Sequence, residues 1–214
     1  MLLPPEEPAF GPWTAMPATS LLESWRAKLP APGLRPGVVA VDGRGGSGKS
    51  TFAAALARAV PGAAVVHTDD LAWHHAFFDW ANLLRDGVLV PVHAGQAVQY
   101  RPPAWDARGR EGAVVVPAGC PLLVVEGSGA ARRELMPWTD VVVWVQTDTG
   151  QAKARAMVRD GGTPEALTFW DEWMAEEFPF FARERPWERA DTVATGAPGV
   201  AHDPAEQVVV SAGR

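Results

Sequence analysis

The chain has 214 residues, of which 47% are hydrophobic and 21% are charged, and its formal net charge is −6. This length suits one well-buried α/β domain and is short for two. The negative charge argues against general nucleic-acid binding, and no apolar run is long enough to span a membrane. A single cysteine, Cys120, excludes an intramolecular disulfide, and the first ten residues lack the basic start of a signal peptide. We therefore expect a cytoplasmic globular protein with no nucleic-acid or membrane partner, and a homo-oligomer stays open.

The first part of the chain predicts an arm followed by a helix. Residues 1–19 contain five prolines and no apolar period, which predicts a loosely packed arm. The sequence TSLLESWRAKL, residues 19–29, predicts an amphipathic helix with a Ser or Thr cap at its start. We expect the remainder, residues 20–214, to form a single domain.

Four short runs farther along the chain are uniformly apolar and of strand length, at residues 37–42, 63–67, 121–127 and 140–146. Strands whose side chains do not alternate are buried on both faces, as in a parallel sheet covered by helices. Helical segments are expected between them, at residues 50–60, 74–85, 128–136, 149–160 and 164–184. This alternation predicts a doubly wound α/β fold. The stretch 93–112 has no regular period and is expected to run over the ligand-binding edge of the sheet.

The sequence GRGGSGKST, residues 43–51, matches the phosphate-binding pattern G-x-x-x-x-G-K-[ST] between a predicted strand and a predicted helix. Glycines let successive backbone N–H groups point inward at phosphate oxygens, and the helix N-terminus adds a favourable dipole. Lys49 is expected to reach the β- and γ-phosphates of ATP, and the Ser50 hydroxyl to bind Mg²⁺. The expected nucleotide-binding residues are Gly43, Arg44, Gly45, Gly46, Ser47, Gly48, Lys49, Ser50 and Thr51.

Carboxylates follow two of the predicted strands. Asp69 and Asp70 come after the second strand and Glu126 ends the third, so all three should lie at the ligand-binding edge of a parallel sheet. Mg²⁺ prefers hard oxygen ligands, and one or two carboxylates suffice beside a bound nucleotide. A transition-metal site is the alternative, made of His67, Asp69, Asp70, His74 and His75. Adjacent histidines on a helix point about 100° apart, which disfavours that alternative.

The chain resembles the uridine kinase-like group of P-loop kinases, which includes uridine–cytidine, nicotinamide riboside and pantothenate kinases. The resemblance rests on GRGGSGKST, HTDD after a strand, VVEG at a later strand, RAMVRD on a helix, and the tail ERPWERADTVATG at residues 184–196. It implies a P-loop fold with a five-stranded parallel sheet flanked by helices. It also implies an acceptor-binding excursion at residues 70–112 and a short lid at residues 155–164.

The same resemblance implies roles for individual residues. Asp69 would act as the general base toward an acceptor hydroxyl and help to order Mg²⁺, and Glu126 would lie near that ion. Arg155 and Arg159 would clamp phosphates together with Lys49. Because the two arginines stand four residues apart, a solvated basic stripe is the alternative for them.

The chain departs from the family pattern around the acceptor. Leu71 and Ala72 replace an aromatic pair, with Trp73 following, and Trp105–Asp106 stands where the family carries Tyr–Asp. These departures favour kinase chemistry in general over uridine in particular. The candidate acceptor-binding residues are Asp70, Trp73, Tyr100, Arg101, Trp105 and Asp106. For Trp73, Phe77, Phe78 and Trp80, core packing and a pocket wall stay open, whereas Trp170, Trp173, Met174 and Phe178 have the helical spacing of packing residues.

The sequence therefore predicts an enzyme that transfers the γ-phosphoryl group of ATP to a hydroxyl of a small-molecule acceptor, either a nucleoside or a nucleoside-like compound. A sugar, vitamin or antibiotic alcohol is the main alternative acceptor. An ATPase without an acceptor and a nucleotide-binding module that has lost catalysis are the other open classes.

Overall fold

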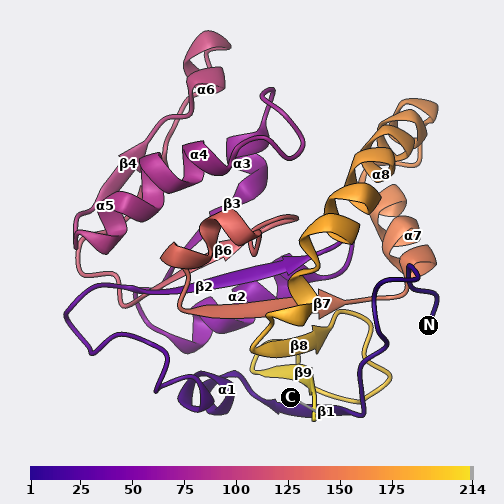
Figure 1. The fold of residues 1–214 in the computed structure, drawn as a ribbon, viewed down its shortest axis with the longest axis horizontal. Coiled ribbons are helices and arrows are strands. Elements are labelled where there is room, and N and C mark those ends of the chain that lie inside the picture. Colours follow the sequence, from indigo (N-terminus) through magenta and orange to yellow (C-terminus); the bar gives the residue numbers. More distant parts are fainter. Residues whose placement is uncertain (213–214) are drawn as a thin grey trace.

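A computed structural model of the chain describes residues 1–212. Its central sheet has seven strands in the order β1-β9-β8-β7-β2-β6-β3 (Figure 1). The five strands from β8 to β3 pair in parallel. Strand β9 runs antiparallel to both of its neighbours, β8 and the edge strand β1. The bounds are β1 Trp13–Pro17, β2 Gly37–Gly43, β3 Ala64–His67, β6 Leu122–Glu126, β7 Val141–Gln146, β8 Thr192–Thr195 and β9 Gln207–Ser211.

The expected α/β fold with five parallel strands is confirmed, but the sheet has two strands more than expected. The strand β9 near the C-terminus and the strand β1 in the proline-rich segment pair with each other over five residues. The arm is also packed rather than loose, since Glu7 is only 5% exposed and accepts hydrogen bonds from Trp144 and Gln146 of β7. Proline content alone did not reveal either feature, because a sheet edge tolerates proline.

Three of the expected helices form nearly at their predicted bounds, α2 Lys49–Ala59, α7 Thr149–Arg159 and α8 Pro164–Glu184. Their ends follow local chemistry. The Asp148 side chain accepts from the backbone of Gly150 and Gln151 at the start of α7, and Thr163 caps α8 in front of Pro164.

Other segments differ from the prediction. Helix α1 is limited to Ala18–Ser24, and residues 74–80 are irregular, with His74 at a φ of 51°. A helix begins only at α4 Ala81–Leu84, continues as a π-helical turn η1 Arg85–Leu89, and ends in α5 Val90–His93. The remaining elements are α3 Thr68–Ala72, β4 Val98–Tyr100, α6 Pro103–Ala107, β5 Val114–Val116, η2 Arg133–Trp138 and η3 Pro186–Glu188.

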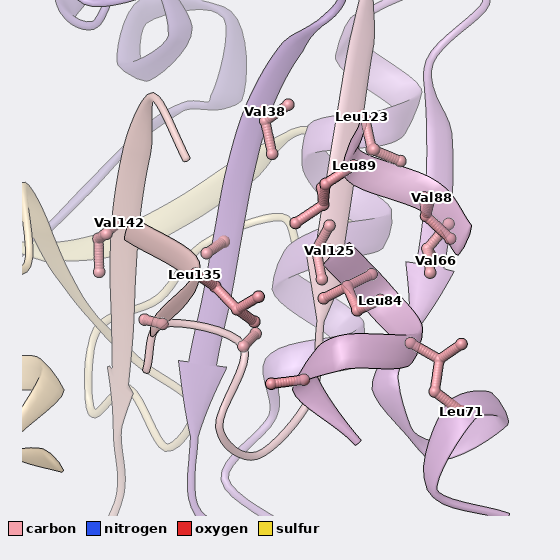
Figure 2. Packing of buried hydrophobic residues seen from close by; sticks show 14 of the residues in the cluster. Val38, Val66, Leu71, Leu84, Val88, Leu89, Leu123, Val125, Leu135 and Val142 are labelled. Carbon is pink, nitrogen blue, oxygen red and sulfur yellow. The ribbon is translucent and has the colours of Figure 1, made fainter. Parts of the chain in front are cut away.

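The sheet is buried on both faces, as its uniformly apolar strands predict. On one face, Val38, Leu123 and Val125 pack with the leucines of the α4–η1 segment (Figure 2). On the other face, the alternate strand residues pack against Phe52 and Leu56 of α2. Within the described residues, no helix is both long and apolar enough to cross a membrane.

Two segments leave the sheet on opposite sides (Figure 1). Helices α7 and α8 lie on one side, and the chain from α4 through α6 lies on the other, where β4 and β5 form a separate antiparallel hairpin. The carboxyl ends of β2, β3 and β6 lie on the side of the sheet toward α7 and α8, and the candidate site is there.

Candidate active site

A cavity of about 920 Å³ lies at the carboxyl ends of β3 and β6, beside the loop that follows β2. Most of the predicted catalytic, nucleotide and metal residues meet there, although they are distant in the sequence. Those that line it are Gly45, Gly46, Gly48, Lys49, Ser50, Thr51, Asp69, Glu126, Arg155 and Arg159. A volume of this size is ample for a nucleotide or for a comparably sized ligand.

The glycine-rich loop runs from the end of β2 into the first turn of α2, and two of its glycines meet helices α7 and α8. A Cβ on Gly46 would lie 2.1 Å from the carbonyl oxygen of Ala152 in α7, and the φ of Gly46 is +75°. A Cβ on Gly45 would lie 2.7 Å from the Trp170 ring in α8. Only glycine therefore allows both helices to pack directly on this loop.

Lys49 is buried at the first position of α2, and its ammonium group lies within the loop. Its Nζ donates to the carbonyl oxygen of Arg44 at 2.9 Å and to the Ser128 hydroxyl at 3.3 Å. The Arg44 side chain turns away from the cavity and pairs with the buried carboxylate of Glu7. The side chain of Arg44 therefore serves packing. The backbone N–H groups of Gly43, Gly45 and Ser47 are bonded within the protein, so the N–H groups at the start of α2 are the ones that can hold phosphate.

Glu126 at the end of β6 lies against Ser50 and His67. The Ser50 hydroxyl is 3.3 and 3.2 Å from its two carboxylate oxygens, and His67 Nδ1 donates to Oε1 at 2.8 Å. Burial alone would raise the pKa of Glu126, but the hydrogen bond from His67 and the charge of Lys49 outweigh it, so the pKa is lowered. The bond to Glu126 in turn raises the pKa of His67. Glu126 is therefore an anion beside the Ser50 hydroxyl.

This pair suits a magnesium ion, because a hydroxyl and a carboxylate provide the hard oxygen donors that Mg²⁺ prefers. The alternative, a transition-metal site built from His67, His74 and His75, lacks a convergent set of ligands. Among residues 1–212, no group of three or more His, Cys, Asp or Glu side chains could hold a metal ion. His67 is engaged with Glu126, and His74 and His75 belong to the irregular segment that lines the cavity.

The two adjacent aspartates have different surroundings. Asp69 lies in the first turn of α3 and lines the cavity. Asp70 does not line it, because its carboxylate pairs with Arg110 at 2.5 Å. The geometry therefore leaves Asp69 accessible to a ligand and fixes Asp70 as a structural partner.

Arg155 and Arg159 of α7 both line the cavity opposite the strand ends. Arg155 Nη1 donates to the carbonyl oxygen of Gly196 at 2.6 Å. The hydrogen bond from Arg159 to Asp160 raises the pKa of the arginine, which stays cationic. Both arginines therefore line the same cavity as the glycine-rich loop and Asp69, and each guanidinium group is also bonded to the protein.

The structure does not bring the expected acceptor residues at positions 100–106 to the cavity. Arg101 pairs with Asp106 and donates to the backbone of Arg110 and Gly112. The Trp105 indole is 4% exposed and donates to the Asp70 carbonyl oxygen at 2.8 Å. The Tyr100 ring is also outside the lining, since it packs against Gly87. Of the six expected acceptor residues, Trp73 alone lines the cavity.

Helix α8 adds residues that the sequence analysis did not assign to the site. Phe169, Trp170 and Trp173 of α8 line the cavity, although the helical spacing of the two tryptophans was interpreted as packing. That spacing is the same for a buried face and for a face that lines a pocket, so periodicity could not distinguish them.

Asp42, the residue before the glycine-rich loop, is another residue that the sequence analysis missed. It is 1% exposed and accepts from the backbone of Gly43, Gly129 and Ala131 at 2.7, 2.8 and 2.9 Å. Burial raises its pKa to about 6 despite these bonds. Asp42 fastens the turn after β6 to the start of the loop and so fixes Ser128 beside Lys49. A carboxylate near the end of an otherwise apolar strand was the sequence signal that could have identified Asp42.

The strand order, the glycine-rich loop between β2 and α2, and the carboxylates at neighbouring strand ends define the α/β fold of P-loop kinases. Two solved structures share this fold. One, described as a "putative fructose transport system kinase" from Silicibacter sp. TM1040, is 22% identical, with a TM-score of 0.52 over 82% of this chain and 95% of that chain. The other, described as a possible uridine kinase from Bacillus stearothermophilus, is 19% identical, with a TM-score of 0.54 over 82% and 96%.

At these identities the similarity establishes the fold, and it confirms the fold that the resemblance to uridine kinase-like proteins implied. No protein-family model matches the sequence, and no curated protein matches it either. Support for the activity therefore comes from the site itself.

Proposed function

We propose that this protein is an ATP-dependent kinase that transfers the γ-phosphoryl group to a hydroxyl of a nucleoside or a nucleoside-like small molecule. One observation carries the proposal. A phosphate-binding loop, a candidate base, a hydroxyl–carboxylate pair suited to Mg²⁺ and two arginines line a single cavity. Phosphoryl transfer needs these groups together, because its catalysis consists of positioning and of stabilising charge.

Each residue has a distinct task in this proposal. Backbone N–H groups of the loop and the Lys49 ammonium hold the phosphates. Ser50 and Glu126 would hold Mg²⁺, which would supply neutralisation of the phosphate charge. Arg155 and Arg159 stabilise the charge on the transferred group, where such contacts contribute most.

Asp69 is assigned to the acceptor. Its carboxylate accepts the proton of the acceptor hydroxyl as that oxygen forms a bond to the γ-phosphorus. The bond between the γ-phosphorus and its bridging oxygen breaks, and the electron pair leaves with ADP. A positioned base typically contributes on the order of 10²–10⁴ in rate. The exposed position of Asp69 in the cavity supports this assignment, as does the engagement of Asp70 with Arg110.

A hydroxyl group of a sugar is the runner-up acceptor. The structure described as a "putative fructose transport system kinase" shares the fold, and the chain departs from the uridine kinase pattern around the acceptor. A water molecule as acceptor, which would make the protein an ATPase, is the third outcome.

The test is acceptor-dependent release of ADP from Mg-ATP, measured over a panel of nucleosides, sugars and vitamin alcohols. We expect one class of alcohol to raise ADP release well above the rate without acceptor. Asp69→Asn keeps the shape of the side chain and removes its charge, so it should abolish most of that increase and leave Mg-ATP binding intact. Rapid ADP release that no alcohol changes would replace the kinase with an ATPase.

A further inference from the structure

Helix α8 presents aromatic rings to the cavity, and Phe77 of the irregular segment after α3 packs against two of them. Phe169, Trp170 and Trp173 line the cavity from α8, and Phe77 lines it from the segment after α3. The Phe77 ring packs edge-on against Phe169 and Trp173, with ring centres 5.7 and 5.1 Å apart. Phe169 nevertheless remains 43% exposed. Exposed aromatic surface inside a cavity is typical of a ligand-binding wall.

This wall is attached to the glycine-rich loop by a buried carboxylate. Glu177 Oε1 accepts from the Gly45 backbone N–H at 2.7 Å and from the Trp173 indole N–H at 3.0 Å. Arg44 lies 3.9 Å from the other carboxylate oxygen. Glu177 therefore fixes the orientation of the Trp173 indole relative to the phosphate-binding loop, and the wall does not depend on a moving lid.

The position of the wall indicates which ligand it serves. The Trp170 and Trp173 rings stand over Gly45, next to Arg44, whose carbonyl oxygen accepts from the Lys49 ammonium. The lysine of this motif reaches the β- and γ-phosphates, so the wall is at the end of the loop where phosphoryl transfer occurs. A ligand against it would be adjacent to the transferred group, where an in-line acceptor must lie.

Charge restricts the ligand further. Three cationic side chains and three carboxylates line the cavity, so their formal charges balance. They are Lys49, Arg155, Arg159, Asp69, Glu126 and Glu176. Bound Mg-ATP would add net negative charge, so an acceptor that is itself an anion would be repelled.

We propose that Trp173, together with Phe77 and Phe169, is the acceptor-binding wall, and that the acceptor is an alcohol carrying a flat ring without negative charge. This inference rests on the proposed kinase function and narrows its substrate class. Flat rings bind aromatic side chains by stacking, and Glu177 keeps the indole in place for it. Sugars without such a ring and alcohols carrying a carboxylate would bind poorly.

The experiment measures binding rather than turnover, by calorimetry on the full chain saturated with Mg²⁺ and a non-hydrolysable ATP analogue. The ring-bearing probes are uridine, adenosine and pyridoxine, the probes without a flat ring are D-ribose and D-fructose, and orotidine provides a carboxylate on a uridine framework. We expect at least one ring-bearing probe to bind at least tenfold more tightly than both sugars, and orotidine to bind more weakly than uridine. Equal or tighter binding of the sugars, or no binding of any ring-bearing probe, overturns the inference.

Variants separate the wall from general effects on folding. Trp173→Leu should weaken the ring-bearing probe about tenfold, as expected for the loss of one stacking contact, and leave the affinity for Mg-ATP unchanged. Trp173→Phe keeps a ring and should retain most of the binding, which guards against a leucine variant that fails to fold. Leu167→Ala is the matched control, because Leu167 is an exposed residue of α8 that does not line the cavity. Loss of Mg-ATP affinity in a folded Trp173→Leu protein would assign the wall to the nucleotide base and overturn the inference.

The two proposals can fail separately. Binding of a ring-bearing probe without any phosphoryl transfer to it would support the wall and contradict the kinase function. Rapid acceptor-dependent ADP release with D-fructose, but with no ring-bearing alcohol, would support the kinase function and contradict the wall.

Discussion

Replacing Gly46 by alanine tests whether helix α7 is seated directly on the phosphate-binding loop. The structure separates two costs. The φ of +75° is strained for any residue with a Cβ, and the added Cβ would lie 2.1 Å from the Ala152 carbonyl oxygen. Gly119 offers a matched control, because its φ of +72° is nearly the same and no atom lies within 4 Å of its added Cβ.

The expected magnitudes follow from that comparison. A left-handed backbone costs an alanine about 1–2 kcal/mol, which is all that Gly119→Ala should lose. Gly46→Ala should lose a further 1–3 kcal/mol or so, because a backbone carbonyl cannot move aside as a flexible side chain can. It should also weaken Mg-ATP binding, since either the loop or α7 must shift.

Urea unfolding followed by circular dichroism gives the free energy of unfolding of both variants, and calorimetry gives the affinity for Mg-ATP. A change in the urea midpoint with a constant slope identifies a true loss of stability. Equal destabilisation by the two alanines, with unaltered Mg-ATP affinity, would refute direct contact between α7 and the loop.

Three further predictions concern the catalytic groups. Mg-ATP should raise the melting temperature of the wild-type protein, and Lys49→Ala should remove most of that shift; indifference of the wild type to millimolar Mg-ATP and Mg-GTP would defeat the phosphate-binding interpretation. Asp69→Asn should cost on the order of 10²–10⁴ in acceptor phosphorylation, and Asp70→Asn much less, because Asp70 is engaged with Arg110; steady-state rates of both variants that reversed this order would reverse the assignment. Arg155→Ala and Arg159→Ala should each lower kcat far more than ATP affinity, whereas unchanged turnover would make them a solvated basic stripe.

The sequence revealed those parts of the fold whose physics is local. The parallel strands are apolar at every position because both faces are covered, and this pattern is visible without any knowledge of neighbours. The strands β1 and β9 were missed because they depend on each other, one lying in a proline-rich segment and the other near the chain end. Residues 74–80 were expected to be helical, yet His74 takes a positive φ and the segment lines the cavity instead.

The same distinction between local and long-range features applies to the candidate site. The gathering of loop residues, Asp69 and Glu126 around one cavity was predictable, because the carboxyl ends of parallel strands meet at one edge of the sheet. The acceptor side was not predictable in the same way. Arg101, Trp105 and Asp106 have the composition of a binding segment, but Arg101 pairs with Asp106, and Trp105 donates directly to the carbonyl oxygen of Asp70. Their composition could not reveal whether the bonding groups face a ligand or the protein.

The phosphate-binding loop is held by contacts with three segments that are distant from it in the sequence. The N-terminal arm reaches it through Glu7 and Arg44, whose buried ion pair has atoms 3.1 Å apart. Helix α8 reaches it through Glu177 and the Gly45 N–H, and the turn after β8 approaches it where Gly196 contacts Gly48. Because these contacts already fix the loop and the aromatic wall, we expect the fold itself to position a bound nucleotide and acceptor, with little contribution from closure of a lid.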